Sequence, residues 1–282
     1  MIKRRILATV VLTVTSFSAI CQYYYKDLVT TKQINENFKI FKANKINHVA
    51  LKSFQGNVAV TEGFVCEQKV NLARNQIMTY TKTADLGESF FTAYYNAAGM
   101  LVKTTDSSQE AVSTSLYEYD ADNRLTSLSH ATRAIDSSSS TFELHAWRYL
   151  ASGKPQQMLR IKNGIDSTVV NFILDEKGNV AEEQAVHKKV AAAKIYYYYD
   201  EKNRLTDVVR YNVKAKRLLP DYIFEYEDNG DLSTMTIVPE GSSDYQKWYY
   251  KYDDTGLKLI DFCYNKKQEL LGKIEYNYTA GR

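Results

Sequence analysis

A motif that recurs about every 25 residues constrains the fold of this chain more than any other feature of its sequence. Each copy has an anchor residue, usually Tyr, with another aromatic residue two positions before it in most copies. After the anchor come an acidic residue in most copies, two variable residues, and Gly or Asn. The anchors are Tyr95, Tyr119, Tyr149, Leu174, Tyr199, Tyr226, Tyr252 and, in a shortened last copy, about Tyr278. A fixed period of this length is typical of an array built from one repeated supersecondary unit.

The fourth residue after the anchor indicates what that unit is. In all seven complete copies it is Gly or Asn, the two residue types that most readily adopt a positive φ. A short hairpin loop built on a type I turn needs one residue in that conformation, and an acidic side chain at its start can accept hydrogen bonds from turn N–H groups. The seven positions are Gly99, Asn123, Gly153, Gly178, Asn203, Gly230 and Gly256. Each copy therefore predicts an antiparallel β-hairpin.

Side-chain alternation predicts which face of these hairpins is buried. The anchors and the residues two positions earlier share one face and are mostly aromatic, whereas the residues between them are mostly polar. Eight hairpins give about sixteen strands, too many for an open sheet to stay flat with an aromatic face in water. We predict an all-β fold over residues 47–282, in which serial hairpins form a curled sheet, shell or barrel-like wrap with the anchors inside.

The segment before the repeats, residues 22–46, has a different pattern. Thr30 and Gln33 resemble a capping box, and Asn44 is a plausible end of a helix. The apolar residues between them recur at helical spacing: Ile34, Phe38 and Phe41. We predict one short amphipathic helix of about fourteen residues that covers an edge or mouth of the sheet. A helix on a membrane surface is the alternative, although its basic residues are few and mixed with an acidic one.

Residues 1–21 have the pattern of a secretory signal peptide. Three basic residues, at positions 3–5, precede an uncharged stretch over residues 6–20 that is short for a membrane span. We expect cleavage after Cys21 and secretion to the periplasm or the cell exterior, with no transmembrane segment after cleavage. A retained anchor is the alternative. We do not expect a lipid anchor on Cys21, because Ile20 is larger than the residue such processing requires before the cysteine.

The charge balance bears on the partners of the exported chain. Three of the 36 Lys and Arg residues lie in the predicted signal peptide, so the remainder equals the 33 Asp and Glu residues. Nucleic-acid recognition depends on neutralising phosphates, so we do not expect nucleic acid as a partner. After cleavage two cysteines remain, Cys66 and Cys263. An oxidising compartment permits a disulfide between them, and two buried thiols are the alternative.

The clearest copies of the repeat, Tyr117 to Leu125 and Tyr197 to Leu205, resemble the YD repeat of the bacterial Rhs family. The resemblance extends from Phe91 to the end of the chain, and the whole is most similar to small secreted YD-repeat proteins. It implies a large extracellular β-shell. It implies no catalytic residue, because the motif is architectural, and neither a C-terminal toxin region nor a self-cleavage site is recognisable here.

Motifs that carry chemistry are missing from the sequence. The four histidines form no HExxH motif, and GxSxG, GxxxxGK[ST] and GxGxxG do not occur. His145 lies on the aromatic face and is expected to be a hydrogen-bonded core residue. Glu182 and Glu183 are adjacent on a strand, so they should point to opposite faces. We expect no catalytic residue, no metal ligand and no cofactor; the turn sequences leave a calcium site open but unsupported.

Tyrosines on the polar face provide a binding hypothesis. They stand where other copies have polar or aliphatic residues: Tyr94, Tyr196, Tyr198 and Tyr249. Exposed aromatic rings can stack on sugars or anchor a protein partner, and ordinary cross-strand packing is the alternative. We predict a non-enzymatic envelope scaffold that binds a protein or a polysaccharide through this face. A sugar-processing enzyme with an acidic pair in the concavity, and a partner or immunity protein of a separate toxin, are the other hypotheses. The oligomeric state is left open.

Overall fold

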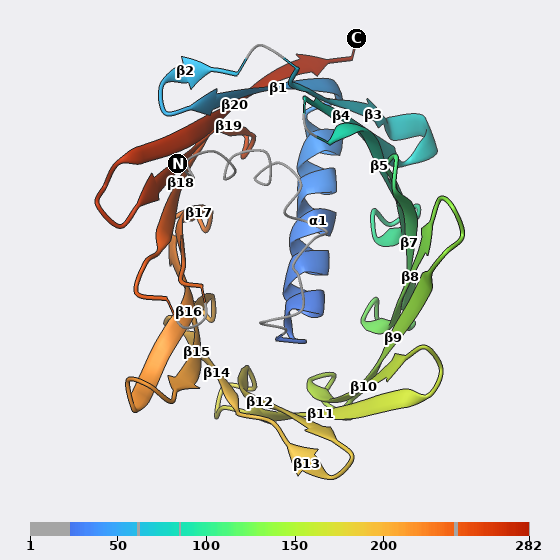
Figure 1. The fold of residues 1–282 in the computed structure, drawn as a ribbon, viewed down its shortest axis with the longest axis vertical. Coiled ribbons are helices and arrows are strands. Elements are labelled where there is room, and N and C mark those ends of the chain that lie inside the picture. Colours follow the sequence, from blue (N-terminus) through green and yellow to red (C-terminus); the bar gives the residue numbers. More distant parts are fainter. Residues whose placement is uncertain (1–22, 61–62, 85, 240–241, 282) are drawn as a thin grey trace.

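The structure is a computed structural model that describes residues 23–60, 63–84, 86–239 and 242–281. The predicted signal peptide, its cleavage site and Cys21 lie outside the described residues. Within them, one helix and a twenty-stranded antiparallel sheet account for most of the chain, and the sheet closes on itself around the helix (Figure 1).

The helix is α1 (Lys26–Ala43), and one short 3-10 turn, η1, covers Leu72–Arg74. The strands are β1 (Ile46–Gln55), β2 (Val58–Ala59), β3 (Val65–Asn71), β4 (Gln76–Thr83), β5 (Gly87–Tyr95), β6 (Leu101–Ser107), β7 (Ala111–Tyr119), β8 (Leu125–Ala134), β9 (Ser140–Tyr149), β10 (Pro155–Lys162), β11 (Asp166–Leu174), β12 (Val180–His187), β13 (Val190–Ala191), β14 (Ile195–Tyr199), β15 (Leu205–Asn212), β16 (Arg217–Tyr226), β17 (Leu232–Ile237), β18 (Gln246–Tyr252), β19 (Lys258–Asn265) and β20 (Leu270–Ala280).

Each strand of the ring pairs with its neighbours along the chain, and the ring closes because β1 pairs with both β20 and β3. The two-residue strands β2 and β13 lie beside this path, since β12 pairs directly with β14. The prediction of an all-β fold of serial hairpins with one N-terminal helix is confirmed, and of the predicted shapes the closed barrel is the one formed.

The repeat turns have the predicted geometry. In the turn Asp120–Arg124, Asn123 has a φ of 60°, and its N–H donates to the Asp120 carbonyl at 3.0 Å. The Asp120 carboxylate accepts from the N–H groups of Asp122 and Arg124, at 3.0 and 2.9 Å. All seven predicted positions have a positive φ: Gly99, Asn123, Gly153, Gly178, Asn203, Gly230 and Gly256. The Gly or Asn in each repeat is therefore there for its backbone conformation.

The anchor tyrosines join neighbouring hairpins near these turns. The ladder between β8 and β9 begins only at Ser127 and Ala146, so the last three residues of β9 have no partner in β8. The hydroxyl of the anchor Tyr149 spans this interval and donates to the Leu125 carbonyl at 2.6 Å. The same bond recurs from Tyr119 to Leu101, from Tyr199 to Val180 and from Tyr226 to Leu205. Tyrosine suits this position because its ring buries apolar area while its hydroxyl satisfies a carbonyl.

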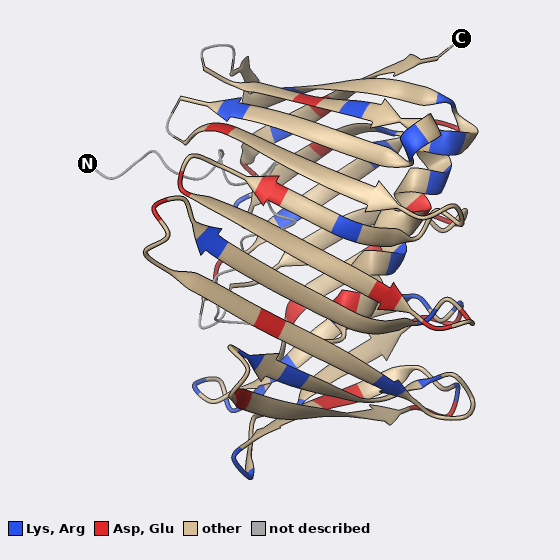
Figure 2. Cartoon of the chain, turned by 90° about the vertical axis from the view of Figure 1, so that its right-hand side faces the viewer, with Lys and Arg blue, Asp and Glu red and all other residues tan. Residues whose placement is uncertain are grey.

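Helix α1 lies across the end of the barrel that carries the repeat turns (Figures 1 and 2). A Cβ placed on the turn residue Gly99 would stand 3.6 Å from the ring of Phe38, and one on Gly256 would stand 3.6 Å from Ile40. The predicted cover of a mouth is thus formed. The end at Asn44 is also as predicted, because its N–H and its side-chain amide both donate to the Ile40 carbonyl at 3.0 Å.

The predicted start of the helix is wrong. The helix has 18 residues and begins at Lys26, so Thr30 lies inside it and forms no cap. Tyr25 occupies the N-cap position without a side-chain cap of its own. The Glu183 carboxylate takes that role, since it accepts the N–H groups of Tyr24 and Tyr25, each at 2.9 Å. A distant carboxylate at a helix N-terminus also interacts favourably with the helix dipole, so a local capping box is not required.

Candidate functional site

The four tyrosines of the binding hypothesis do not form one site. Tyr94 lies on β5, Tyr196 and Tyr198 on β14, and Tyr249 on β18, so three separate parts of the ring carry them (Figure 1). Tyr94 lies beneath the ammonium group of Lys103, 5.6 Å from its ring centroid. Tyr249 makes similar local contacts, with Lys247 at 5.3 Å and the Tyr264 ring at 5.6 Å. These two rings are occupied by cross-strand packing on the outer wall.

Tyr196 and Tyr198 border a shallow depression of about 460 Å³ in the outer wall. Its other border is the turn between β11 and β12, over residues 175–177, and Tyr198 is 47% exposed. Residues 181–182 and 197–200 complete the lining. The depression lies where β12 and β14 pair through only two residue pairs, Glu182 with Tyr196 and Glu183 with Ile195.

Three of the four carboxylates around this depression are engaged. Asp175 accepts from the Asn179 N–H at 2.8 Å, and Asp200 accepts from the Arg204 N–H at 2.9 Å, a bond that lowers the pKa of Asp200. Glu182 binds the Lys194 ammonium at 2.6 Å. The depression therefore offers aromatic surface edged by polar groups, which suits binding better than acid–base chemistry.

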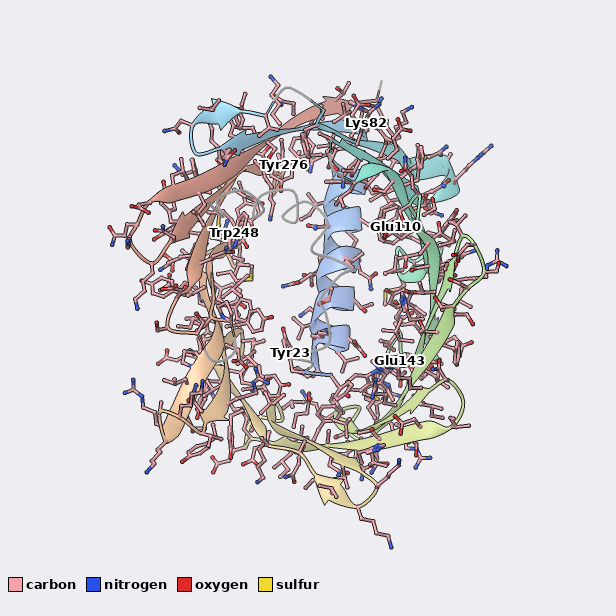
Figure 3. The ribbon with its side chains drawn as sticks, in the orientation of Figure 1. Tyr23, Lys82, Glu110, Glu143, Trp248 and Tyr276 are labelled. Carbon is pink, nitrogen blue, oxygen red and sulfur yellow. The ribbon has the colours of Figure 1, made fainter. Side chains whose placement is uncertain are left out.

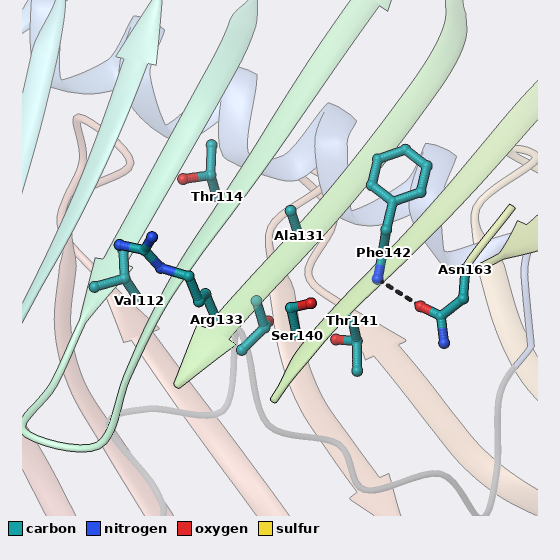
Figure 4. Close-up of a pocket in the computed structure, with 9 residues that line it drawn as sticks. Val112, Thr114, Ala131, Arg133, Ser140, Thr141, Phe142 and Asn163 are labelled. Carbon is teal, nitrogen blue, oxygen red and sulfur yellow. Dashed lines mark hydrogen bonds between the residues drawn. The ribbon is translucent and has the colours of Figure 1, made fainter. Parts of the chain in front are cut away.

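A second depression, of about 600 Å³, lies on the outer wall across β7, β8 and β9 (Figure 4). Hydroxyl and apolar side chains line it together with Arg133 and Asn163. The Asn163 side chain accepts from the Phe142 N–H at 2.8 Å, so it supports the neighbouring strand. This lining brings together no carboxylates and no nucleophile–base pair.

The inner wall carries a buried charged network beside the start of α1. His145 on β9 contacts Asp27 through Nδ1 at 2.6 Å and Glu143 through Nε2 at 2.8 Å. Arg160 on β10 donates to the other oxygen of Glu143 at 2.7 Å. Glu143 and Tyr23 both lie on the inner side of the ring (Figure 3). The interpretation of His145 as a hydrogen-bonded core residue is confirmed, since it is buried and both ring nitrogens have partners.

The hydrogen bonds in this network determine its charges. Burial alone would lower the pKa of His145, but its bonds to Asp27 and Glu143 outweigh burial and raise that pKa to about 9. Burial alone would raise the pKa of Glu143, but the bonds from His145 and Arg160 lower it to about 2. His145 and Glu143 are therefore both ionised at neutral pH, and the Glu143 carboxylate faces two cations, His145 and Arg160.

Glu183, on β12, is the second inner contact of the segment that leads into α1. Besides the two backbone N–H groups it accepts the Tyr197 hydroxyl at 2.7 Å, while burial raises its pKa. Glu182 points outward, as the alternation predicts. Carboxylates and aromatic rings thus do gather inside the barrel, but Asp27, Glu143 and Glu183 all serve to hold the helix start.

Sequence analysis missed Asp27, Glu143, Arg160 and Glu183 as a group. The signal for one of them was available. Glu143 stands six residues before the anchor Tyr149, so it shares the face that is otherwise aromatic, and an acid on such a face must have a buried partner. Its partner His145 was placed on the same face. Asp27 could not be assigned in this way, because the expected helix began after it.

The two cysteines are free and buried. Cys66 lies on β3, opposite Leu51, and Cys263 lies on β19, opposite Gly272. Strands β1 and β20 separate them in the ring, so at ~4.8 Å per strand they stand roughly 14 Å apart, beyond the reach of a disulfide. The disulfide suggested for Cys66 and Cys263 is not formed; strand pairing between β1 and β20 closes the array instead.

Within the described residues no group of three or more His, Cys, Asp and Glu side chains is placed to hold a metal ion. No helix among the same residues has the length and apolarity needed to cross a membrane.

Fold and repeat together define a closed β-shell built from serial hairpins. Residues 95–135 match the family model of the RHS repeat, an interval that contains the turns after Tyr95 and Tyr119. The chain therefore carries an RHS repeat, and the resemblance noted from its sequence is confirmed. A comparison with curated proteins gives no match.

Solved structures with similarity to this chain include components of Tc toxins and a porin-like protein. The crystal structure of TcdB2-TccC3-TEV aligns over 76% of this chain and 12% of its own, with 12% identity and a TM-score of 0.34. The Photorhabdus luminescens Tc holotoxin pore aligns over 85% and 17%, with 9% identity and a TM-score of 0.30. A porin-like protein from Bacteroides uniformis aligns over 83% and 98%, with 8% identity and a TM-score of 0.39. This chain spans less than a fifth of either toxin chain.

Proposed function

We propose that this chain is a non-enzymatic scaffold of the bacterial envelope, exported by its N-terminal segment, whose outer wall binds a polysaccharide at the depression beside Tyr196 and Tyr198. The observation that carries the proposal is the pair of outward-facing tyrosines, two residues apart on β14, at the border of this depression. Sugar rings have apolar faces that stack on aromatic side chains and hydroxyl rims that need polar partners.

The contacts around the four outer tyrosines support this choice of site. Tyr94 and Tyr249 already have a cation over the ring, whereas Tyr198 is exposed and has no ring or cation contact among the described residues. The polar rim is supplied by Glu176 and Lys177 of the neighbouring turn. A neutral glycan fits this rim, because the other carboxylates are held by turn N–H groups or by Lys194.

Co-sedimentation with isolated peptidoglycan and isolated surface polysaccharide tests the proposal. Residues 22–282 should bind one of them saturably, and the double variant Tyr196→Ala/Tyr198→Ala should lose at least about tenfold in affinity, as expected when a stacking pair is removed. The matched control is Tyr94→Ala/Tyr249→Ala, which removes two outer tyrosines away from the depression and should bind as the unmodified chain does.

Three outcomes contradict the proposal. Equal loss in both double variants would show that the depression is not the site. Absence of binding to either polymer would leave a protein partner as the ligand of the scaffold. Release of new reducing ends from a bound polysaccharide would show an enzyme rather than a binding protein.

A further inference from the structure

We propose that the wall of the barrel has a gate between β12 and β14, and that residues 23–27, which we call the strap, hold this gate closed from inside. The proposal concerns the shell itself and does not depend on polysaccharide binding.

The first observation is the short ladder at this place. β12 and β14 share two residue pairs, whereas β8 and β9 share seven. Farther along β12, Val186 and His187 pair with β13, in an excursion that leaves the path of the ring. Between the two ladders the Ala192 N–H donates to the Ala185 carbonyl at 2.8 Å. Val190 in this excursion is 71% exposed, so little packing holds it. Few backbone hydrogen bonds and little burial are the conditions for local opening.

The second observation is that side chains and backbone of the strap contact both β12 and β14, where the ladder between these two strands is short. The Glu183 carboxylate joins three segments, because it accepts the N–H groups of Tyr24 and Tyr25 and the Tyr197 hydroxyl. Glu183 belongs to β12 and Tyr197 to β14, so this bond crosses the gate. Hydrogen bonds to a buried carboxylate are stronger than those between neutral groups.

Aromatic rings of the strap also pack on strands on either side of the gate. The Tyr25 ring stands edge-on to Tyr197 on β14, at 5.2 Å, and within 6.4 Å of Phe172 on β11. The Tyr23 ring contacts Tyr197 at 6.1 Å and Tyr222 on β16 at 5.6 Å. Together the two rings span the wall from β11 to β16.

The strap is fixed at its other end by the charged network. Asp27 binds His145 on β9, which lies on the far side of β10 and β11 from the gate. The strap therefore runs along the inner wall from β9 to β14. Its release would free both edges of the gate at once, and the two residue pairs together with the outer ion pair between Glu182 and Lys194 would then hold β12 to β14.

Hydrogen exchange on the unmodified chain, without any ligand, is the first test. Amides of residues 195–199 should exchange about tenfold faster than those of residues 142–146 on β9, because opening of the gate exposes them without unfolding the shell. Equal protection of the two segments would overturn the proposal, and this measurement does not depend on whether any variant folds.

The second test is the variant Glu183→Ala, with Glu182→Ala as its control. Glu182 neighbours Glu183 on the same strand but faces outward, where it binds Lys194. Glu183→Ala should raise exchange of residues 195–199 by about a further tenfold and leave residues 142–146 unchanged. Glu182→Ala removes only the outer contact with Lys194 at the same junction, so it should raise exchange of residues 195–199 by a clearly smaller factor. A uniform rise over all strands in Glu183→Ala would mean global destabilisation and would refute a local gate.

The buried thiols provide an independent readout of access to the interior. Cys66 and Cys263 lie on the inner wall, each 2% exposed. A small maleimide should modify them about tenfold faster in Glu183→Ala than in Glu182→Ala under native conditions, since exchange-competent opening limits both reactions. Equal rates would show that strap release does not open the wall.

Discussion

The two ends of α1 are held to the barrel by different physical means. At the C-terminal end Phe38 is fully buried and stacks on the anchor Tyr95, with ring centroids 3.9 Å apart, within a cluster of apolar side chains. At the N-terminal end Asp27 and the backbone of Tyr24 and Tyr25 bind ionisable side chains of β9 and β12. Burial of apolar area is the main contact at the C-terminal end, whereas the N-terminal end adds charge and hydrogen bonds to the packing of its aromatic rings.

This difference indicates which attachment of the helix should depend on pH and which should not. Apolar packing is insensitive to pH and contributes in proportion to the area buried. A buried ionic network is costly to desolvate and gains its stability only while every member keeps its charge and its partner. The apolar end therefore secures the cover over the mouth, while the charged end makes the position of the strap depend on conditions.

The largest effect is expected at the apolar end. Phe38→Ala should lower the free energy of unfolding by about 4 kcal/mol, because it removes a fully buried ring and leaves a cavity against Tyr95. Urea unfolding at pH 5.5 and pH 8.5 measures this loss of stability, which should be the same at both pH values. Phe41→Ala is the control, since this ring is half-buried and should cost less. A pH-dependent loss in Phe38→Ala would contradict the separation between the two ends.

The charged end should respond to pH in a defined window. His145 has a pKa raised from 6.5 to about 9, so its contribution is complete below pH 6.5 and is lost as the pH rises through about 9. Glu143 has a pKa lowered from 4.5 to about 2, so its contribution is complete above pH 4.5 and is lost as the pH falls through about 2. Both contributions are complete together only between about pH 4.5 and 6.5.

Unfolding measured between pH 6 and pH 9 tests this window. The free energy of unfolding of the unmodified chain should fall by about 3 kcal/mol across this range because of His145. In His145→Gln, which cannot carry a proton at either pH, that fall should be absent, and the stability at pH 6 should already be low. A fall of equal size in His145→Gln would assign the pH dependence to other groups.

The wall of the barrel was predictable from the sequence, and the attachment of the helix was not. Repeated local chemistry determines the wall: Gly or Asn at a positive φ and a Tyr anchor recur in nearly every copy, so each hairpin can be inferred from its own residues. Closure by pairing of β1 with β20, and capping of α1 by Glu183 from a distance of 158 residues along the chain, depend on how sixteen or more strands curve together. No single window of sequence contains that information.

The binding hypothesis likewise had one part that the sequence could predict and one part that it could not. Alternation correctly placed Tyr196 and Tyr198 on the outer face, because it is a local property of one strand. The depression beside them lies on the side of the repeat turns, where the turn over residues 175–177 faces the end of β14, so it depends on how two neighbouring hairpins are placed. Tyr94 and Tyr249 satisfied the same pattern, but both lie away from the depression and each has a lysine ammonium over its ring.

The smallest expected effect tests whether the wall itself is uniform between the two ends of the helix. Tyr119 donates to Leu101, which belongs to the apolar cluster around Phe38, while Tyr149 donates to Leu125, which belongs to the cluster around Tyr24 at the charged end, both at 2.6 Å. Tyr119→Phe and Tyr149→Phe should each lower the free energy of unfolding by about 1 kcal/mol, because each leaves one carbonyl without its donor. Urea unfolding at pH 6 measures both. Equal losses mean that the difference between the two regions resides in how the helix is held, since the wall contributes the same bond at each. A loss of stability in Tyr149→Phe alone would instead show that the wall differs between the two regions. The charged network would then stabilise the hairpins near Tyr149 as well as the strap.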